Sequence, residues 1–82
     1  MPAINGVVAG VDTSTEPASV LLSVGKDQGV ERGYQFTIYR RDTFIGKVVV
    51  TKPMRDSSGA RVLFTAPGQQ IRAGDTAATR LD

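Results

Sequence analysis

The stretch Val30-Glu31-Arg32-Gly33-Tyr34 recurs in altered form as Ile71-Arg72-Ala73-Gly74-Asp75, about forty residues further along the chain. Two more segments repeat at nearly the same spacing: Gly6-Val7-Val8 with Gly46-Lys47-Val48, and Val20-Leu21-Leu22 with Arg61-Val62-Leu63. The repeated signals follow the same order in both halves. The sequence therefore predicts two copies of one small unit.

Apolar residues occur in short alternating runs, and Gly or Pro interrupts nearly every stretch before an amphipathic helix could form. This pattern predicts six strands, at residues 6–12, 19–24, 34–40, 44–51, 60–65 and 76–81. Two interleaved three-strand units can close on each other and remove the exposed edges of an open sheet. We therefore expect an all-β fold, a small six-stranded closed barrel built from two pseudo-symmetric three-strand halves. An SH3-like or open sandwich arrangement of the same strands is the alternative.

At 82 residues the chain is long enough for a single modest core. We expect one β-barrel domain over residues 1–82, with halves at about 4–40 and 44–81, and the abrupt start at Met1-Pro2 suggests excision from a longer protein. The predicted core is apolar: Val7 or Val8, Val20, Leu22, Val24, Val30, Phe36, Ile38, Ile45, Val48, Val50, Val62, Phe64 and Ile71.

Four glycines occupy equivalent places in the two halves and are predicted to be structural: Gly6 with Gly46, and Gly33 with Gly74. Equivalent positions imply a shared backbone need, such as positive φ in a turn. The glycine-rich loop 25–33 matches neither phosphate-binding glycine pattern, and it is better explained as a turn between two strands.

Composition limits the chemistry. The chain has no Cys and no His, so disulfides, thiolate metal sites and the usual nucleophile–base pairs are excluded. Ser57 and Ser58 lie near Lys52 but belong to a polar turn. The carboxylates of Asp12, Asp27, Asp56 and Asp75 lack calcium-loop spacing. We expect no catalytic, cofactor-binding or metal-binding residues, and no apolar run is long enough to span a membrane.

The net charge of +2 permits a polyanion partner without requiring one. The middle of the chain is its most basic part, and a weak polyanion patch would use Arg40, Arg41, Lys47 and Lys52. Nucleic-acid grooves combine such cations with aromatic side chains, here Tyr34, Phe36 and Tyr39. Side-chain alternation, however, places Phe36 in the core. We therefore favour the interpretation that these basic residues lie on solvated strand faces and do not form a nucleic-acid groove.

The run 24–36, followed by Phe44-Ile45-Gly46-Lys47-Val48 and closed by Ile71-Arg72-Ala73-Gly74-Asp75, resembles a pattern found in bacterial envelope proteins. It is similar to the β-domain of the rod-shape protein MreC, to the C-terminal domain of the flagellar T-ring protein and, more broadly, to six-stranded cradle-loop barrels. This resemblance implies a structural module in the bacterial envelope or periplasm that packs against copies of itself or other components. It transfers no catalytic residue.

The favoured hypothesis is a non-enzymatic structural or protein-interaction barrel of a bacterial envelope or scaffold protein, with a protein partner or a homo-oligomer. Assembly would use an uncovered strand edge or a patch around Tyr39, Phe44 and Leu81, and the sequence leaves this choice open. The alternative is a nucleic-acid-binding barrel related to transcription or translation. A small-ligand or sugar-binding module is the third hypothesis.

Overall fold

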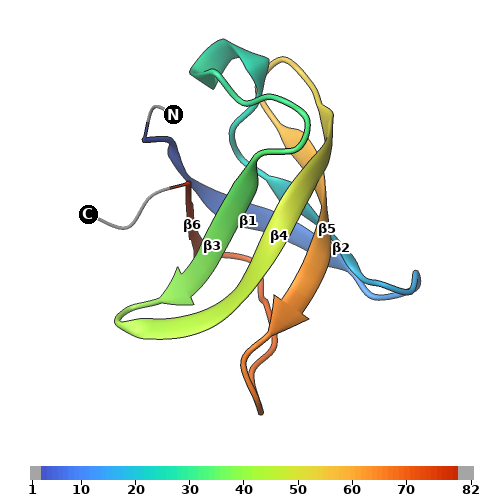
Figure 1. Cartoon of the computed structure of the whole chain (residues 1–82), viewed down its shortest axis with the longest axis vertical. Helices are drawn as coiled ribbons and strands as arrows, with labels where there is room; N and C mark the ends of the chain where they lie inside the picture. The colour runs from blue at the N-terminus through green and yellow to red at the C-terminus, as the bar shows by residue number, and fades with distance from the viewer. Residues whose placement is uncertain (1–2, 80–82) are drawn as a thin grey trace.

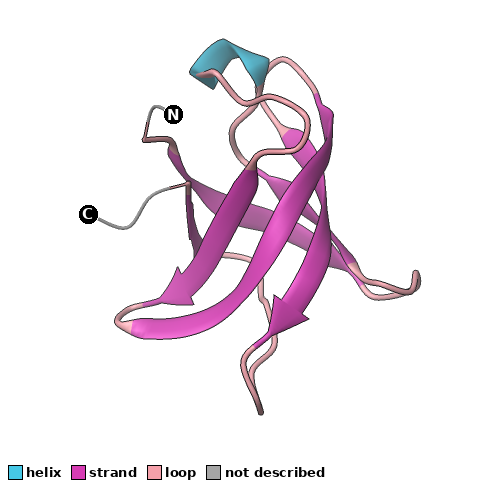
Figure 2. Cartoon of the chain, viewed as in Figure 1, coloured by secondary structure: helices cyan, strands magenta, loops and turns pink. Residues whose placement is uncertain are grey.

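Six antiparallel strands close into a barrel in the computed structural model, which describes residues 3–79 (Figure 1). The strands are β1 (Asn5–Asp12), β2 (Ser19–Leu22), β3 (Gln35–Arg40), β4 (Thr43–Pro53), β5 (Ser58–Thr65) and β6 (Thr76–Ala78). One short 3-10 helix, η1 (Lys26–Gln28), lies between β2 and β3 (Figure 2). The order around the barrel is β1-β2-β5-β4-β3-β6. The predicted closed barrel is confirmed, and the open sandwich is wrong.

The strand order has the two-fold symmetry that the repeat predicts. Exchanging β1 with β4, β2 with β5 and β3 with β6 leaves the order around the barrel unchanged. The two glycine turns also make equivalent hydrogen bonds. The backbone N–H of Gly33 donates to the carbonyl of Val50 at 2.8 Å, and that of Gly74 donates to the carbonyl of Val8 at 2.7 Å. The glycine turns of the two halves therefore have the same backbone hydrogen-bonding arrangement.

The core fills the barrel with inward-facing side chains from all six strands and the turns. Most predicted members are confirmed as buried: Val8, Val20, Leu22, Val24, Val30, Phe36, Ile38, Ile45, Val48, Val50 and Ile71. Of the two alternatives in β1, Val8 is the core residue, whereas Val7 is exposed. The prediction missed Ile4, Ala60, Ala77 and Ala78, because Ile4 precedes the first predicted strand and small alanines give little apolar signal.

Strict alternation fails near the end of β5, and this makes one core prediction wrong. Phe64 is 53% exposed, and Val62 is only partly buried. The β4–β5 register shifts between Lys47 and Val48, so that Val48 pairs with Val62 while Lys47 pairs with Phe64. Leu63 is the extra residue of this bulge. Phe64 therefore lies opposite Lys47 and outside the barrel.

The outer face of β4 and the end of the last strand complete the description. Val49 is half-buried, between the buried Val48 and Val50. The last strand ends at Ala78, before the predicted boundary at residue 81, and residues 80–82 lie outside those that the structure describes.

The four repeat glycines serve two different backbone needs. Gly33 and Gly74 have φ of +89° and +95°, a region that residues with a side chain rarely adopt. Gly46 has no such φ, but a Cβ there would lie 2.6 Å from the carbonyl oxygen of Phe64. At Gly6 a Cβ would lie 3.0 Å from the side chain of Val24. The second pair therefore allows close approach of neighbouring chain segments.

The loop 25–33 forms η1, which lies on the tip of the β4–β5 hairpin at one end of the barrel (Figure 1). The backbone N–H of Lys26 donates to Met54, and that of Asp27 donates to Arg55, both at 2.7 Å. Gly29 ends η1 with φ of +91°. The expected turn is therefore an ordered 3-10 turn tied to the opposite half of the chain.

Candidate functional site

A partly buried ion pair links the two halves of the barrel. The guanidinium of Arg40 donates to both carboxylate oxygens of Asp75, from Nε at 2.7 Å and from Nη2 at 2.9 Å. Asp75 is 4% exposed and also accepts the backbone N–H of Arg72 at 2.8 Å. Nη2 of Arg40 donates further to the carbonyl of Gln70. Arg40, expected in a polyanion patch, thus has its charge balanced inside the protein.

The pKa of the Asp75 carboxyl reflects opposing influences. Burial raises this pKa, but the hydrogen bonds from Arg40 and the backbone of Arg72, with the charges of both arginines, outweigh burial. The net result is a pKa below the ordinary value of 3.8. The hydrogen bond to Asp75 in turn raises the pKa of Arg40. The pair is therefore ionised at neutral pH and acts as a structural clamp.

This ion pair predicts an acid-dependent loss of stability. Because folding lowers the pKa of Asp75, its contribution is fully present above the unfolded value near 3.8 and is lost as the pH falls through the folded value. We expect the free energy of unfolding, measured by urea titration between neutral and strongly acidic pH, to fall more steeply for the wild type than for Asp75→Asn. Parallel pH profiles for the two proteins would contradict this assignment.

The other residues of the predicted polyanion patch are spread along β4 and do not form one cluster. Arg41 is exposed in the β3–β4 turn with φ of +56°. Lys47 is half-buried opposite Thr37, and Lys52 is exposed near the far end of β4. At about 3.3 Å per residue, the part of β4 from Thr43 to Lys52 alone spans up to about 30 Å. The patch as predicted is therefore not a single binding site.

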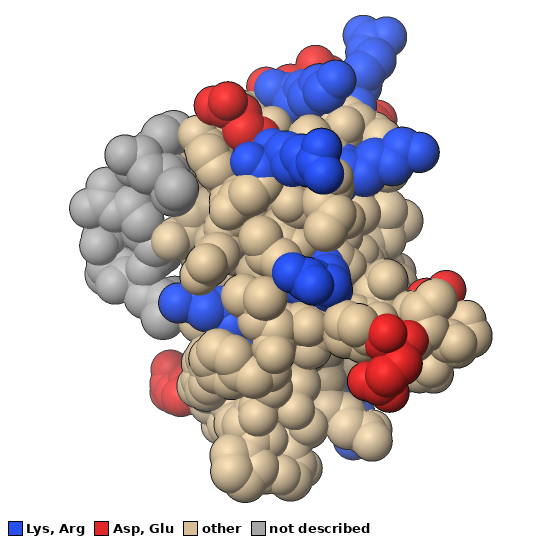
Figure 3. All heavy atoms as spheres, turned by 45° about the vertical axis from the view of Figure 1, so that its right-hand side comes forward, with Lys and Arg blue, Asp and Glu red and all other residues tan. Residues whose placement is uncertain are grey.

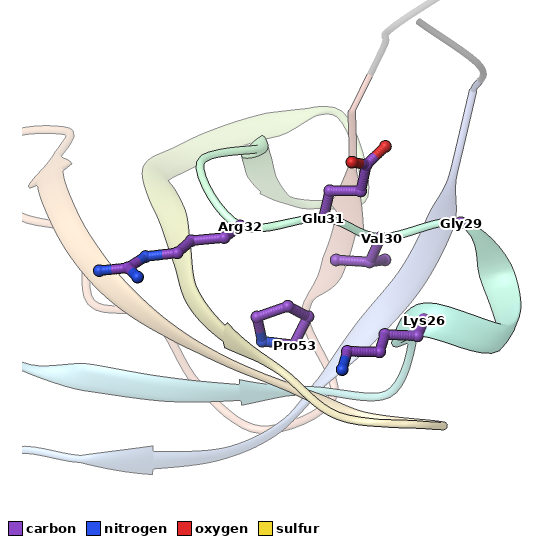
Figure 4. A pocket seen from close by; sticks show the side chains of 6 residues that line it. All are labelled: Lys26, Gly29, Val30, Glu31, Arg32 and Pro53. Carbon is purple, nitrogen blue, oxygen red and sulfur yellow. The ribbon is translucent and has the colours of Figure 1, made fainter.

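Two cations of the η1 end border a hollow of about 470 Å³. Figure 4 shows the side chains of Lys26 and Arg32 on either side of Pro53, with Glu31 pointing away. Glu31 accepts the hydroxyl of Tyr34 at 3.0 Å. The backbone N–H groups of Gly29 and Val30 donate within the loop itself. The hollow thus offers two side-chain cations, while the backbone N–H groups of Gly29 and Val30 are already used within the loop.

An exposed aromatic pair lies on the outside of β4 and β5. The rings of Phe44 and Phe64 have centroids 6.1 Å apart at an interplanar angle of 48°. They are 41% and 53% exposed, and the neighbouring Leu63 is 39% exposed. We call these three residues the aromatic patch. Exposed apolar side chains gathered in one place are typical of interaction sites.

The sequence indicated this surface only in part. Phe44 was expected in an assembly patch with Tyr39 and Leu81. Tyr39 is the cross-strand partner of Phe44, whereas Leu81 lies outside the described residues. Phe64 was missed because a bulge leaves no clear signal in an alternating strand. The alternative route to assembly, an uncovered strand edge, is not present in residues 3–79, where each strand is paired on both sides.

Of the polar residues considered for catalysis, Ser58 has a structural role. Ser58 is fully buried and donates its hydroxyl to the carbonyl of Val24 at 2.7 Å, while Lys52 is exposed. Across residues 3–79, acidic side chains do not gather in groups of three that could hold a metal ion. Within the same range, each buried side-chain polar atom has a hydrogen-bond partner.

Comparison with known proteins gives no relative. No family model, curated protein or solved structure matches this chain. In the part of the chain that the structure describes, no helix has the length and apolar character needed to cross a membrane.

Proposed function

We propose that this barrel is a non-enzymatic structural module that associates with other copies of the same chain, in a bacterial envelope or scaffold protein. The aromatic patch is the observation that carries the proposal. Complete burial of a fully exposed Phe side chain contributes about 1.5 to 3 kcal/mol, and these rings, which are already about half buried, can gain about half of that each. The resemblance to envelope β-domains supplies the cellular setting.

A second copy of this chain is the favoured binding partner of the aromatic patch, because the barrel has another exposed apolar surface. Val7 and Leu21 are 43% and 41% exposed on β1 and β2, the strands that the repeat makes equivalent to β4 and β5. Each copy therefore carries two exposed apolar surfaces, and association can bury both. Closed symmetric assemblies of identical chains are the commonest oligomers.

The test is the mass of the protein in solution, measured by size-exclusion chromatography with light scattering over a concentration series. We expect a dimer or larger assembly for the wild type and a monomer for Phe44→Ser/Phe64→Ser. The matched control is Met54→Ser, which removes a side chain of 38% exposure from the opposite end of the barrel and should leave the mass unchanged. A wild type that stays monomeric at every concentration would refute the proposal.

Nucleic-acid binding is the second candidate function, and the position of Lys47 favours it. Lys47 lies directly opposite Phe64 across β4 and β5, which combines a cation with an exposed ring. The same mass measurement with a single-stranded oligonucleotide added separates the two functions. A complex that forms with the oligonucleotide and dissociates as salt rises would favour this candidate over self-association.

A further inference from the structure

The two hairpins that the repeat makes equivalent carry opposite charge. The β4–β5 hairpin, residues 43–65, has four cations and one acid: Lys47, Lys52, Arg55, Arg61 and Asp56. The β1–β2 hairpin, residues 5–22, has two acids and no cation: Asp12 and Glu16. We call them the basic hairpin and the acidic hairpin, with net charges of +3 and −2. The two equivalent hairpins thus carry opposite net charge.

The basic hairpin combines its cations with the most exposed large apolar side chain of residues 3–79. Phe64 lies opposite Lys47, and Arg61, three residues earlier on β5, lies opposite Val49. In Figure 3 the Lys and Arg side chains gather mainly over the upper part of the molecule, the η1 end of the barrel, whereas β5 ends toward the lower end (Figure 1). The positive charge beside the exposed Phe64 ring therefore comes from Lys47.

The acidic hairpin contains a hollow of about 280 Å³ on its outer side. Gly10 opens it, since no atom lies within 4 Å of the place where its Cβ would be. The exposed Leu21 and the carboxylate of Asp12 also line the hollow. Hydrogen bonds from the side chain and backbone of Ser14 lower the pKa of Asp12, so that its carboxyl is ionised at neutral pH. The hollow thus has an apolar wall and one ionised carboxylate, and Arg61 of the same copy lies opposite the lining residue Ser19 on the neighbouring strand.

We propose that the basic hairpin of one copy docks on the acidic hairpin of a second copy, with Phe64 entering the hollow beside Gly10 and Leu21. This inference rests on the self-association proposed above and names the surfaces that meet. Contact between two basic hairpins would instead bring like charges together, which opposes binding. Because β2 and β5 are paired neighbours, the two surfaces flank one seam, and a two-fold dimer can form both contacts at once.

Charge reversal tests this pairing. One variant, Lys47→Glu/Arg61→Glu, makes both hairpins negative, and a second, Asp12→Lys/Glu16→Lys, makes both hairpins positive. The mass of each variant is measured alone and in an equal mixture, at low salt where charges act over longer distances. We expect each variant alone to dissociate at least about tenfold more readily than the wild type, and the mixture to recover most of the wild-type affinity.

The possible outcomes distinguish the hairpin pairing from the proposed self-association on which it rests. A wild type that never associates refutes both. A wild type that associates, together with an Asp12→Lys/Glu16→Lys variant that associates equally well, refutes only the hairpin pairing and assigns the contact to two aromatic patches. Failure of the mixture to recover, although both variants keep the wild-type melting temperature, also refutes the pairing. Recovery itself shows that both variants are folded.

Discussion

Replacing Leu22 by Ala is expected to lower the free energy of unfolding by about 2 to 5 kcal/mol. Leu22 is fully buried and is among the largest side chains in the centre of the barrel. It pairs with Val8 on one side and with Ser58 on the other, so that β2 cannot shift inward without breaking two ladders. The cavity left by the missing atoms would therefore persist, and the loss should lie in the upper part of this range.

The neighbouring residue provides a control within the same strand. Leu21 is 41% exposed on the outer face of β2, and Leu21→Ala should change the free energy of unfolding by less than about 1 kcal/mol. Urea unfolding followed by circular dichroism measures both variants. Equal losses for the two leucines would mean that the inward face of β2 has been assigned incorrectly.

Replacing Gly25 by Ala is expected to cost about 3 kcal/mol, at the upper end of the range for overpacking. A Cβ at this position would clash with the carbonyl oxygen of Met54 and lie 2.5 Å from that of Ser57. Both atoms belong to the backbone of the β4–β5 loop, so neither can rotate away as a side chain could. The substitution should push η1 away from the hairpin tip and weaken the bonds from Lys26 and Asp27.

Gly10→Ala is the matched control, because the same change there meets open space. Gly10 lies within β1, where Ala is the better residue, so stability should stay equal or rise slightly. Thermal unfolding of the two variants measures the difference. A Gly25→Ala protein as stable as Gly10→Ala would show that η1 does not approach the hairpin as closely as described.

Most of the fold could be predicted because the patterns that indicate strands and turns are local in sequence and occur in both halves of the chain. The alternation of Phe36 and Ile38 in β3 set the inward face of that strand. The paired glycine turns marked where each half reverses direction. Closure followed from a general reason, since two three-strand units leave edges that only the other unit can cover. These features depend on neighbours in sequence, which a sequence displays directly.

The interaction surface could be predicted only in part. Phe64 fits the inward pattern of Ala60 and Val62, and nothing in the sequence marks the bulge at Leu63 that turns it outward. Arg40 looked like a free surface cation beside Arg41. Its partner Asp75 is 35 positions away, and the pair forms only because β3 and β6 are neighbours in the closed barrel.

The sequence by itself determined the strand periodicity, the turns and the two-fold repeat, because these follow from side-chain alternation and the backbone freedom of glycine. It also determined that one hairpin is basic and the other acidic. Only the tertiary structure decided which surface each hairpin presents, where Phe64 points and which cation Asp75 neutralises. Those properties depend on strand register and on contacts between distant segments, which exist only once the barrel has closed.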